Sequence, residues 1–358
     1  MVQAPEGYRH REPCPVIGFS TGEVFLSVNQ STEPPGTKYG ACDPHILQFS
    51  AREPKNSGVT VRPVWDDGAA FTDHSYRGVA ADGKNGEILL LNIHARSGDQ
   101  YWSFRSSDGD WVNNGIIHFP IRSCYPQVAL RDRRAGVLAI GDIVEPIDEW
   151  RQYKFDKTGS GWDYVFRRLF YAYTPDVSKS SFAEPVEIDD LEATSGHIRN
   201  LDLWIDDRGM SHILYLKRSV QSALMRDKFF PDVPLTSSLE YVVMDGGEVA
   251  KRVTLLKGGE GASGEVPGNA RFQVTGDGRL LVIYRCSGSD ADGNSVNDMR
   301  LMQILPEMDK KPVKIPLREN FGVFFNATER GGSPPADVID LFGSGRNNVL
   351  RYARVRLQ

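Results

Sequence analysis

Three histidines occupy the same place in a repeated sequence pattern. His10, His74 and His197 each stand twelve residues before the glycine of a tight turn that joins two short apolar segments. Equivalent positions of a repeat lie at equivalent points of successive structural units. An imidazole titrates near neutral pH, so it can accept or release a proton during catalysis. We therefore predict that the three side chains meet at one end of the fold and form a catalytic or binding site.

The repeated unit also predicts the fold that positions these histidines. Short apolar or alternating runs, separated by Gly, Asp or Asn turns, recur along the chain and are typical of β-strands. They form six units, which begin near residues 13, 74, 125, 197, 269 and 324, and no convincing amphipathic helix lies between them. We expect an all-β, single-domain β-propeller of six or seven four-stranded blades over residues 1–358. Residues 1–12 are expected to close the ring, because the last unit ends one strand short; two stacked β-sheets are the alternative.

The composition is that of an ordinary globular chain. The 358 residues are 40% hydrophobic, and 42 Lys and Arg stand against 47 Asp and Glu, a net charge of −5 without long runs of one sign. This balance argues against nucleic acid or an anionic membrane as the main partner. No segment approaches the roughly 18 apolar residues of a membrane span. The first residues show no apolar signal-peptide core, so localisation is left open, and a periplasmic or secreted location fits if an export signal has been removed. Oligomeric state is also left open.

The sequence predicts no required cofactor. Its four cysteines lack CxxC spacing and are expected to be free thiols, with Cys14 and Cys124 buried beside apolar strand starts. Two alternatives with a structural metal stay open. Three histidines at one mouth could bind zinc, and the alternating carboxylates of Asp290 and Asp292 lie in a loop that could bind calcium.

One stretch of the chain resembles a known family. The segment DHSYRGVAADGKNGEILLLNIHARSGDQYWSFRSSDG and the later CYPQVAL are similar to the propeller polysaccharide lyases of the sialidase-like superfamily, such as the short ulvan lyases. They are also similar to propeller glycosidases that act on rhamnosyl-glucuronate. Within the segment, FRSSDGDWV looks like a shortened Asp-box, a turn found in sialidase-type propellers. The resemblance covers roughly residues 70–145 and implies that His74, His94 and Tyr125 are catalytic.

β-Elimination from a uronate is the chemistry that these groups would perform. It needs a base for the proton on C5, an acid for the leaving oxygen, and cationic groups that neutralise the carboxylate. His74 or Tyr125 would be the base, with His94 as its partner. Arg77 and Arg199 open predicted inner strands and would hold the carboxylate by paired hydrogen bonds. The expected substrate-binding residues are His10, Arg11, Arg77, His197, Arg199, Asn200, Asn269 and Arg271.

Two other functions stay open. The segment HREPCPVIGF contains the Arg-x-Pro that opens the first blade of sialidases, so Arg11 could contact a carboxylate in a sialidase-like or rhamnosyl-glucuronate-type hydrolase. A non-catalytic glycan-binding propeller is the other alternative, because a fold alone does not determine a function. An anionic glycan is the expected partner in each case. The aromatic residues expected on rim loops, where they would stack on sugars, are Tyr101, Trp102, Trp150 and Trp162.

Overall fold

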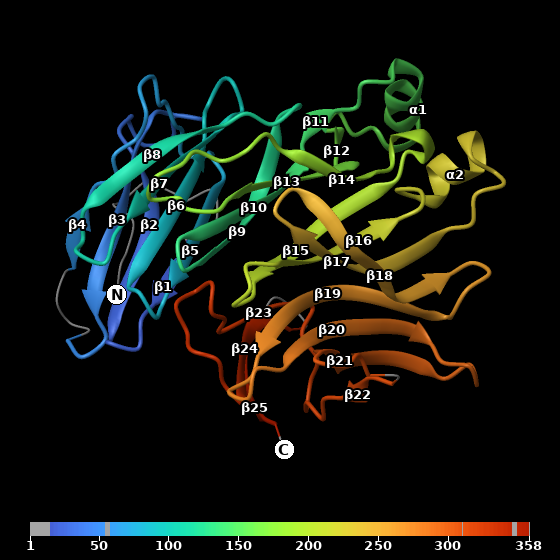
Figure 1. Ribbon diagram of the computed structural model, residues 1–358. Helices are drawn as coiled ribbons and strands as arrows, with labels where there is room; N and C mark the ends of the chain where they lie inside the picture. Colours follow the sequence, from blue (N-terminus) through green and yellow to red (C-terminus); the bar gives the residue numbers. More distant parts are fainter. Residues whose placement is uncertain (1–14, 54–57, 310, 346–348, 358) are drawn as a thin grey trace.

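The chain forms a β-propeller of six blades, which confirms the predicted fold class. The computed structural model describes residues 15–53, 58–309, 311–345 and 349–357. In Figure 1 the colour changes steadily around the ring, from the blue first blade through green and yellow to the red sixth blade, so the blades follow one another in chain order.

Five blades show four antiparallel strands each. The first contains β1 (Val16–Gly18), β2 (Glu23–Ser31), β3 (Cys42–Ser50) and β4 (Val59–Val61), and the second contains β5 (Arg77–Asp82), β6 (Glu87–Ile93), β7 (Gln100–Arg105) and β8 (Trp111–Ile117). The third contains β9 (Ser123–Arg131), β10 (Arg134–Gly141), β13 (Arg168–Thr174) and β14 (Val186–Asp190). The fourth contains β15 (His197–Ile205), β16 (Ser211–Arg218), β17 (Thr236–Asp245) and β18 (Glu248–Gly259), and the fifth β19 (Glu265–Val274), β20 (Leu280–Ser289), β21 (Ser295–Leu305) and β22 (Val313–Lys314).

The sixth blade has three strands within the described residues. These are β23 (Val323–Asn326), β24 (Val338–Ser344) and β25 (Leu350–Arg356). The fourth strand that we predicted from residues 1–12 lies outside the described residues.

The apolar cores lie between neighbouring blades. Separate clusters of buried side chains join each consecutive pair from the first blade to the sixth. Because a sheet packed on both faces has no solvent side, β6 is buried at every position. Its one charged residue, Glu87, accepts a hydrogen bond of 3.0 Å from Arg133 Nε. Burial between two blades therefore explains why the sequence of β6 is a nearly continuous apolar run.

The loop between β23 and β24, residues 327–337, lines the cavities at both ends of the central channel and is called the channel loop below. Gly18 N donates to Gly331 O at 2.9 Å, and Ala81 N donates to Arg330 O at 2.8 Å. Gly332 has a φ of 86°, and a Cβ at this residue would lie 2.9 Å from Gly18 O. Only glycine therefore fits there without strain. The loop joins the sixth blade to the first and second by backbone hydrogen bonds.

Two short α-helices interrupt the strands, at segments where the sequence shows no convincing amphipathic pattern. α1 (Asp148–Thr158) belongs to an insertion in the third blade, between the short strands β11 (Ile143–Val144) and β12 (Tyr164–Val165). α2 (Ala223–Phe229) follows β16, and a 3-10 turn covers Glu192–Thr194. Within α1, Lys154 is the one buried residue. Since α1 has no apolar stripe, periodicity could not reveal it.

Candidate functional site

A cavity of about 980 Å³ lies at the starts of the inner strands, and all six blades contribute to its wall. The residues come from β1, β5, β9, β15, β19 and β23, and the channel loop forms part of the lining. This is the end of the channel at which the repeat predicted a site. The side chains of its described lining with polar atoms are Tyr76, Arg77, Tyr125, Gln127, Trp162, His197, Arg199, Asn200, Asn269, Arg271, Asn326, Thr328, Arg330 and Ser333.

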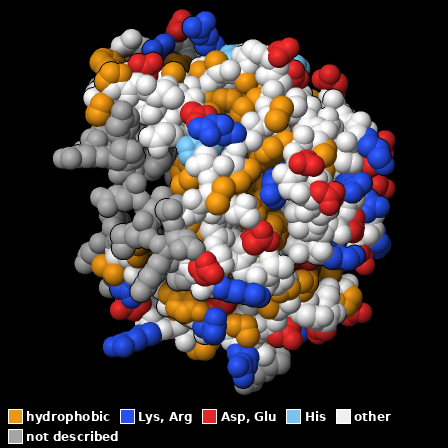
Figure 2. All heavy atoms as spheres, turned by 90° about the vertical axis from the view of Figure 1, so that its left-hand side faces the viewer, with side chains coloured by type: hydrophobic (Ala, Val, Ile, Leu, Met, Phe, Trp, Pro, Cys, Tyr) orange, Lys and Arg blue, Asp and Glu red, His pale blue; other side chains and the backbone are white. Residues whose placement is uncertain are grey.

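The charged side chains among the described lining residues are cationic. They are the guanidinium groups of Arg77, Arg199, Arg271 and Arg330. By contrast, acidic and basic side chains are mixed over the outer face seen in Figure 2. The lining therefore favours an anion, although the whole chain carries a net charge of −5.

Burial changes the titration of two of these arginines. It lowers the pKa of Arg271 to about 10, and burial followed by the charge of Arg218 lowers the pKa of Arg199. Arg271 Nη1 donates to Leu201 O at 2.6 Å, which fixes the guanidinium at the wall. Both groups stay protonated at neutral pH, so each can bind a carboxylate.

Arg330 has an internal counter-ion. Its Nε lies 2.9 Å from Asp202 Oδ1, and Asp202 is buried. Asp202 Oδ2 also accepts a hydrogen bond from Phe272 N. This pair attaches the channel loop to β15, so Arg330 forms part of the wall while its charge is largely compensated.

Three inner strands carry a β-bulge at the cavity. β9 has an extra residue at Tyr125 and Pro126, β15 has the extra residue Leu201, and β19 has one between Pro267 and Ala270. A bulge bends its strand and changes the direction of nearby side chains. Residues next to each bulge line the cavity. The bulges of these three neighbouring blades thus bring the polar residues Tyr125, Asn200 and Asn269 to the cavity wall.

Tyr125 has an unusual backbone conformation within its bulge. Its φ is 51°, a region that non-glycine residues seldom adopt. Asn200 Nδ2 donates to Tyr125 O at 2.7 Å, which holds this conformation from the neighbouring blade. The Tyr125 side chain is 42% exposed, and its hydroxyl lies 3.0 Å from that of Tyr76. Retained strain of this kind is concentrated at functional sites.

His197 lines the cavity as the first residue of β15. Burial, with smaller contributions from Arg218 and Arg199, lowers the pKa of His197 to about 4. The Phe166 ring separates it from Tyr125, with ring centroids 5.8 Å from His197 and 6.0 Å from Tyr125. The imidazole is therefore neutral at pH 7.

His74 lies behind the cavity wall, in the turn before β5. It is not among the described lining residues, and its ring centroid is 5.6 Å from Tyr76 and 5.1 Å from Tyr39. His74 thus reaches Tyr125 through the Tyr76 ring. The equal sequence spacing did not give His74 and His197 equal places, because β15 extends back to residue 197 with a bulge, whereas β5 begins at Arg77.

The other predicted residues occupy several environments. His94 follows β6, where its Nδ1 accepts hydrogen bonds from Ser97 N at 3.1 Å and Arg96 N at 3.4 Å, and its ring stacks on Tyr101. No described contact joins His94 to His74. Asn269 Nδ2 donates to the backbone of the sixth blade at Phe324 O, 3.0 Å away, so it ties two blades together as Asn200 does. His10 and Arg11 lie outside the described residues.

Sequence reasoning did not identify Tyr76, Phe166 and Arg330 as parts of this site. Tyr76 had a signal, because it directly precedes Arg77 in the repeated unit. Phe166 belongs to the insertion and Arg330 to the channel loop, and neither segment repeats.

The rim prediction was right in position for Trp162, which lines the cavity. It was wrong for Trp102 and Tyr101, which are 0% and 7% exposed because they lie on β7 between packed blades. Trp150 packs against Phe229 and Phe230 instead of facing the cavity.

The other sequence signals have structural explanations. In the FRSSDGDWV turn, Ser106 N donates to Asp110 O and Gly109 N donates to Ser106 O. These bonds show a tight turn, and the resemblance to an Asp-box stays a prediction. Asp290 accepts hydrogen bonds from the backbone of its own loop. Among the described residues no group of three or more His, Cys, Asp or Glu is arranged to hold a metal ion. Cys42 and Cys286 are free thiols, Cys124 is buried, and Cys14 lies outside the described part of the chain.

No helix of the described residues has the length and apolarity needed to cross a membrane.

Comparisons with known proteins identify the fold of this chain. No family model and no curated protein sequence matches the chain. A PL25 ulvan lyase superposes with a TM-score of 0.51 and 11% identity, covering 97% of this chain and 80% of its own. A PL25 ulvan lyase bound to -[GlcA(1-4)Rha3S]- superposes with a TM-score of 0.50 and 11% identity, covering 96% of this chain and 80% of its own. The α-L-arabinanase of Penicillium chrysogenum superposes with a TM-score of 0.48 and 13% identity, covering 96% of this chain and 92% of its own. At these identities, the two lyase superpositions show that this chain shares their propeller fold.

Proposed function

We propose that this chain is a carbohydrate-active enzyme that cleaves a uronate-containing polysaccharide by β-elimination in the arginine-lined cavity. The observation that carries the proposal is the position of Tyr125. Its phenol is accessible, its backbone has a positive φ, and the described charged groups of the same wall are guanidinium ions.

The arginines fit the first requirement of the reaction, which is neutralisation of the sugar carboxylate. Arg199 and Arg271 come from adjacent blades and line one cavity. A guanidinium offers two parallel N–H donors to a carboxylate. As the C5 proton leaves, negative charge moves onto the carboxylate, and fixed cations stabilise this charge most strongly in the transition state. The arginines would therefore accelerate the reaction as well as bind the sugar.

The second requirement is transfer of two protons. A base takes the proton from C5, the C4–O bond breaks, a C4–C5 double bond forms, and the leaving oxygen receives a proton. Tyr125 presents its hydroxyl in the cavity and can serve one of these transfers. His197 lines the same cavity, is neutral at pH 7, and would serve the other transfer. We propose this step without a cofactor, because it is a redistribution of protons and electrons within the substrate.

His74 is the alternative partner of Tyr125. It contacts the Tyr76 ring, and the Tyr76 hydroxyl is hydrogen-bonded to that of Tyr125. In this arrangement His74 orients the tyrosine pair. His94 would act at greater distance, by supporting the turn after β6.

The resemblance of residues 70–145 to propeller lyases supports elimination, and the ulvan lyase superpositions support the fold in which it would occur. Hydrolysis of most glycosides uses two carboxylic acids that flank the bond. The described lining residues include arginine, tyrosine and histidine but no carboxylic acid.

One assay separates elimination, hydrolysis and binding without cleavage. The protein is incubated with a panel of uronate polysaccharides that includes ulvan, and the ultraviolet absorbance of an unsaturated uronate is followed together with reducing ends. We expect both signals to rise. Reducing ends alone would establish a hydrolase, and binding without either signal would establish a lectin-like propeller.

A further inference from the structure

We propose that Trp162 forms a second sugar subsite, which stacks on the unit next to the acidic sugar and makes the cavity specific for chains of at least two units. This inference rests on the proposed function, because it assumes that an acidic glycan enters the cavity.

The first observation is the exposure of the Trp162 side chain. It is 67% exposed, the highest value for a tryptophan among the described residues, and it still lines the cavity. Tryptophan is enriched at binding interfaces, because one part of its ring system is apolar and the indole N–H is polar. The C–H face of a pyranose ring is apolar and packs on an indole, while the sugar hydroxyls stay solvated.

The second observation is that aromatic rings lead from the reaction centre to the rim. Tyr125 contacts Phe166 with ring centroids 6.0 Å apart, and Phe166 and Trp162 line the same cavity. The Trp162 ring also contacts the Tyr164 ring, with 5.5 Å between the ring centroids. A glycan whose acidic unit is held by the arginines would therefore meet the Trp162 ring with a neighbouring unit.

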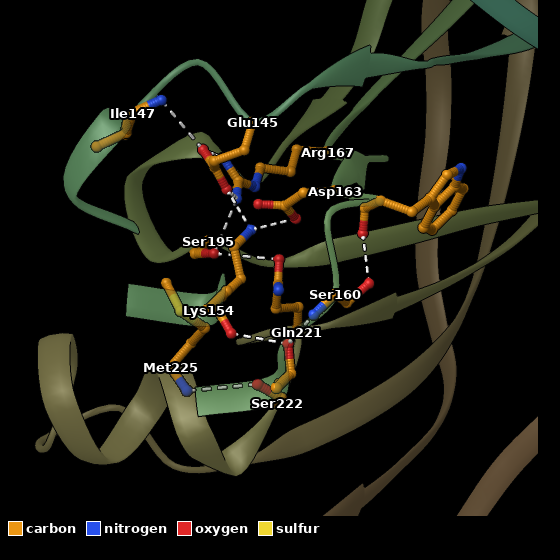
Figure 3. A network of polar contacts seen from close by, with 12 residues as sticks. Glu145, Ile147, Lys154, Ser160, Asp163, Arg167, Ser195, Gln221, Ser222 and Met225 are labelled. Carbon is orange, nitrogen blue, oxygen red and sulfur yellow. Dashed lines mark hydrogen bonds and ion pairs between the residues drawn. The ribbon is translucent and has the colours of Figure 1, made fainter. Parts of the chain in front are cut away.

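The third observation is that the backbone around Trp162 is held on both sides (Figure 3). Trp162 O accepts a hydrogen bond from Ser160 Oγ at 3.2 Å. The next residue, Asp163, pairs with Lys154 Nζ at 2.7 Å, and Asp163 O accepts from Glu145 N at 2.9 Å. A ring on such a backbone loses little conformational freedom when it binds a ligand.

A buried ion network anchors this segment to the propeller. In Figure 3, Glu145 pairs with both Lys154 of α1 and Arg167, the residue before β13, and the side chains of Glu145 and Arg167 are fully buried. Arg167 Nη2 donates to Ser195 Oγ at 2.9 Å, two residues before His197. The network therefore fixes the insertion relative to the inner strand of the fourth blade. This network would keep the Trp162 subsite at a constant distance from the reaction centre.

The test compares affinity for long and short ligands. Trp162→Ala and Trp162→Phe are titrated with an ulvan tetrasaccharide and with free glucuronate, by calorimetry. We expect Trp162→Ala to weaken tetrasaccharide binding by about 10-fold, the factor expected for loss of one ring-stacking contact, and to leave glucuronate binding unchanged. Trp162→Phe should recover part of the loss. Phe155→Ala is the control, because Phe155 is 49% exposed on α1 in the same insertion and lies outside the cavity lining.

Asp163→Asn tests the anchoring separately. It keeps the shape of the side chain and removes the charge that pairs with Lys154, so we expect a smaller loss of tetrasaccharide affinity with unchanged glucuronate binding. Equal loss for both ligands, or no loss with Trp162→Ala, overturns the subsite. If the wild type binds the tetrasaccharide but does not cleave it, the elimination proposal fails while the affinity ratio still decides the subsite. If the wild type binds neither ligand, both proposals fail.

Discussion

The two ends of the central channel use similar side chains in opposite ways. Where the inner strands begin, Arg199 and Arg271 line a cavity of about 980 Å³ and have no ion-pair partner among the described residues. Where the inner strands end, a cavity of about 410 Å³ contains Arg131 and Glu329, whose charged atoms lie 3.3 Å apart. Trp204 Nε1 adds a hydrogen bond of 2.6 Å to the same carboxylate.

This difference separates a binding end from a structural end. A charge that is already paired gains little from an external ion, because binding must first break the internal pair. A guanidinium without an internal carboxylate keeps its full attraction for an anion. We therefore propose that the arginine-lined cavity binds the substrate and that the ion pair at the end that contains Glu329 stabilises the fold.

The largest expected effect is on turnover at the binding end. Tyr125→Phe removes one hydroxyl from an exposed side chain, and we expect turnover to fall by about 10²–10⁴-fold, the range that general acid–base groups supply. The melting temperature should change little. Steady-state kinetics with the best substrate of the panel, together with thermal unfolding, measure both. Full activity in a folded Tyr125→Phe protein would exclude the phenol from proton transfer.

A comparison of two histidines sharpens the assignment of the second proton carrier. His197→Gln should lower turnover by about 10²–10⁴-fold if His197 is the base. His74→Ala should cost about 10-fold through the tyrosine pair, because His74 contacts Tyr76 rather than the described cavity lining. The kcat values of the two variants decide the matter. The reverse order would make His74 the base and His197 a binding residue.

The arginines are expected to act on binding as well as on turnover. Arg199→Met keeps much of the apolar stem and removes the charge, so the KM for an acidic substrate should rise by about 10–100-fold, since a hydrogen bond to a charged group contributes about 1.5–3 kcal/mol. Arg131→Met at the other end is the matched control and should leave KM unchanged. Equal changes in KM would show that the two ends do not differ in binding.

Much of this site could be predicted because it lies in the repeated part of the sequence. Arg77 and Arg199 open inner strands, so their repeat positions placed them at one mouth. Trp162 and Arg330 lie in an insertion and a connecting loop, where no repeat gives a position. The strained Tyr125 and its hydrogen bond from Asn200 depend on a bulge, and hydrophobic patterns carry no information about such a local shift.

The pH dependence of folding should report on His197. Its pKa falls from 6.5 to about 4 in the folded protein. Between these values the unfolded chain binds more protons than the folded one, so stability contributed by the neutral imidazole is lost as pH falls from 6.5 toward 4. Chemical denaturation across this range should show a shallower pH dependence for His197→Gln than for the wild type. Identical slopes would contradict a depressed pKa.

The smallest effect on activity is expected at the structural end. Trp204→Phe removes the hydrogen bond to Glu329, which should lower the free energy of unfolding by about 1 kcal/mol. Both kcat and KM should match the wild type. Loss of activity without loss of stability would indicate a second functional site at that end.

The most direct test of the account changes the charge of the substrate instead of the protein. The uronate polysaccharide that is cleaved best is compared with the same polymer after chemical reduction of its carboxyl groups to alcohols. The account predicts that the wild type cleaves the acidic polymer, forms an unsaturated product and loses both activity and affinity toward the reduced polymer. Equal cleavage and equal affinity for the two polymers would contradict it, because the arginine-lined cavity would then not recognise a carboxylate.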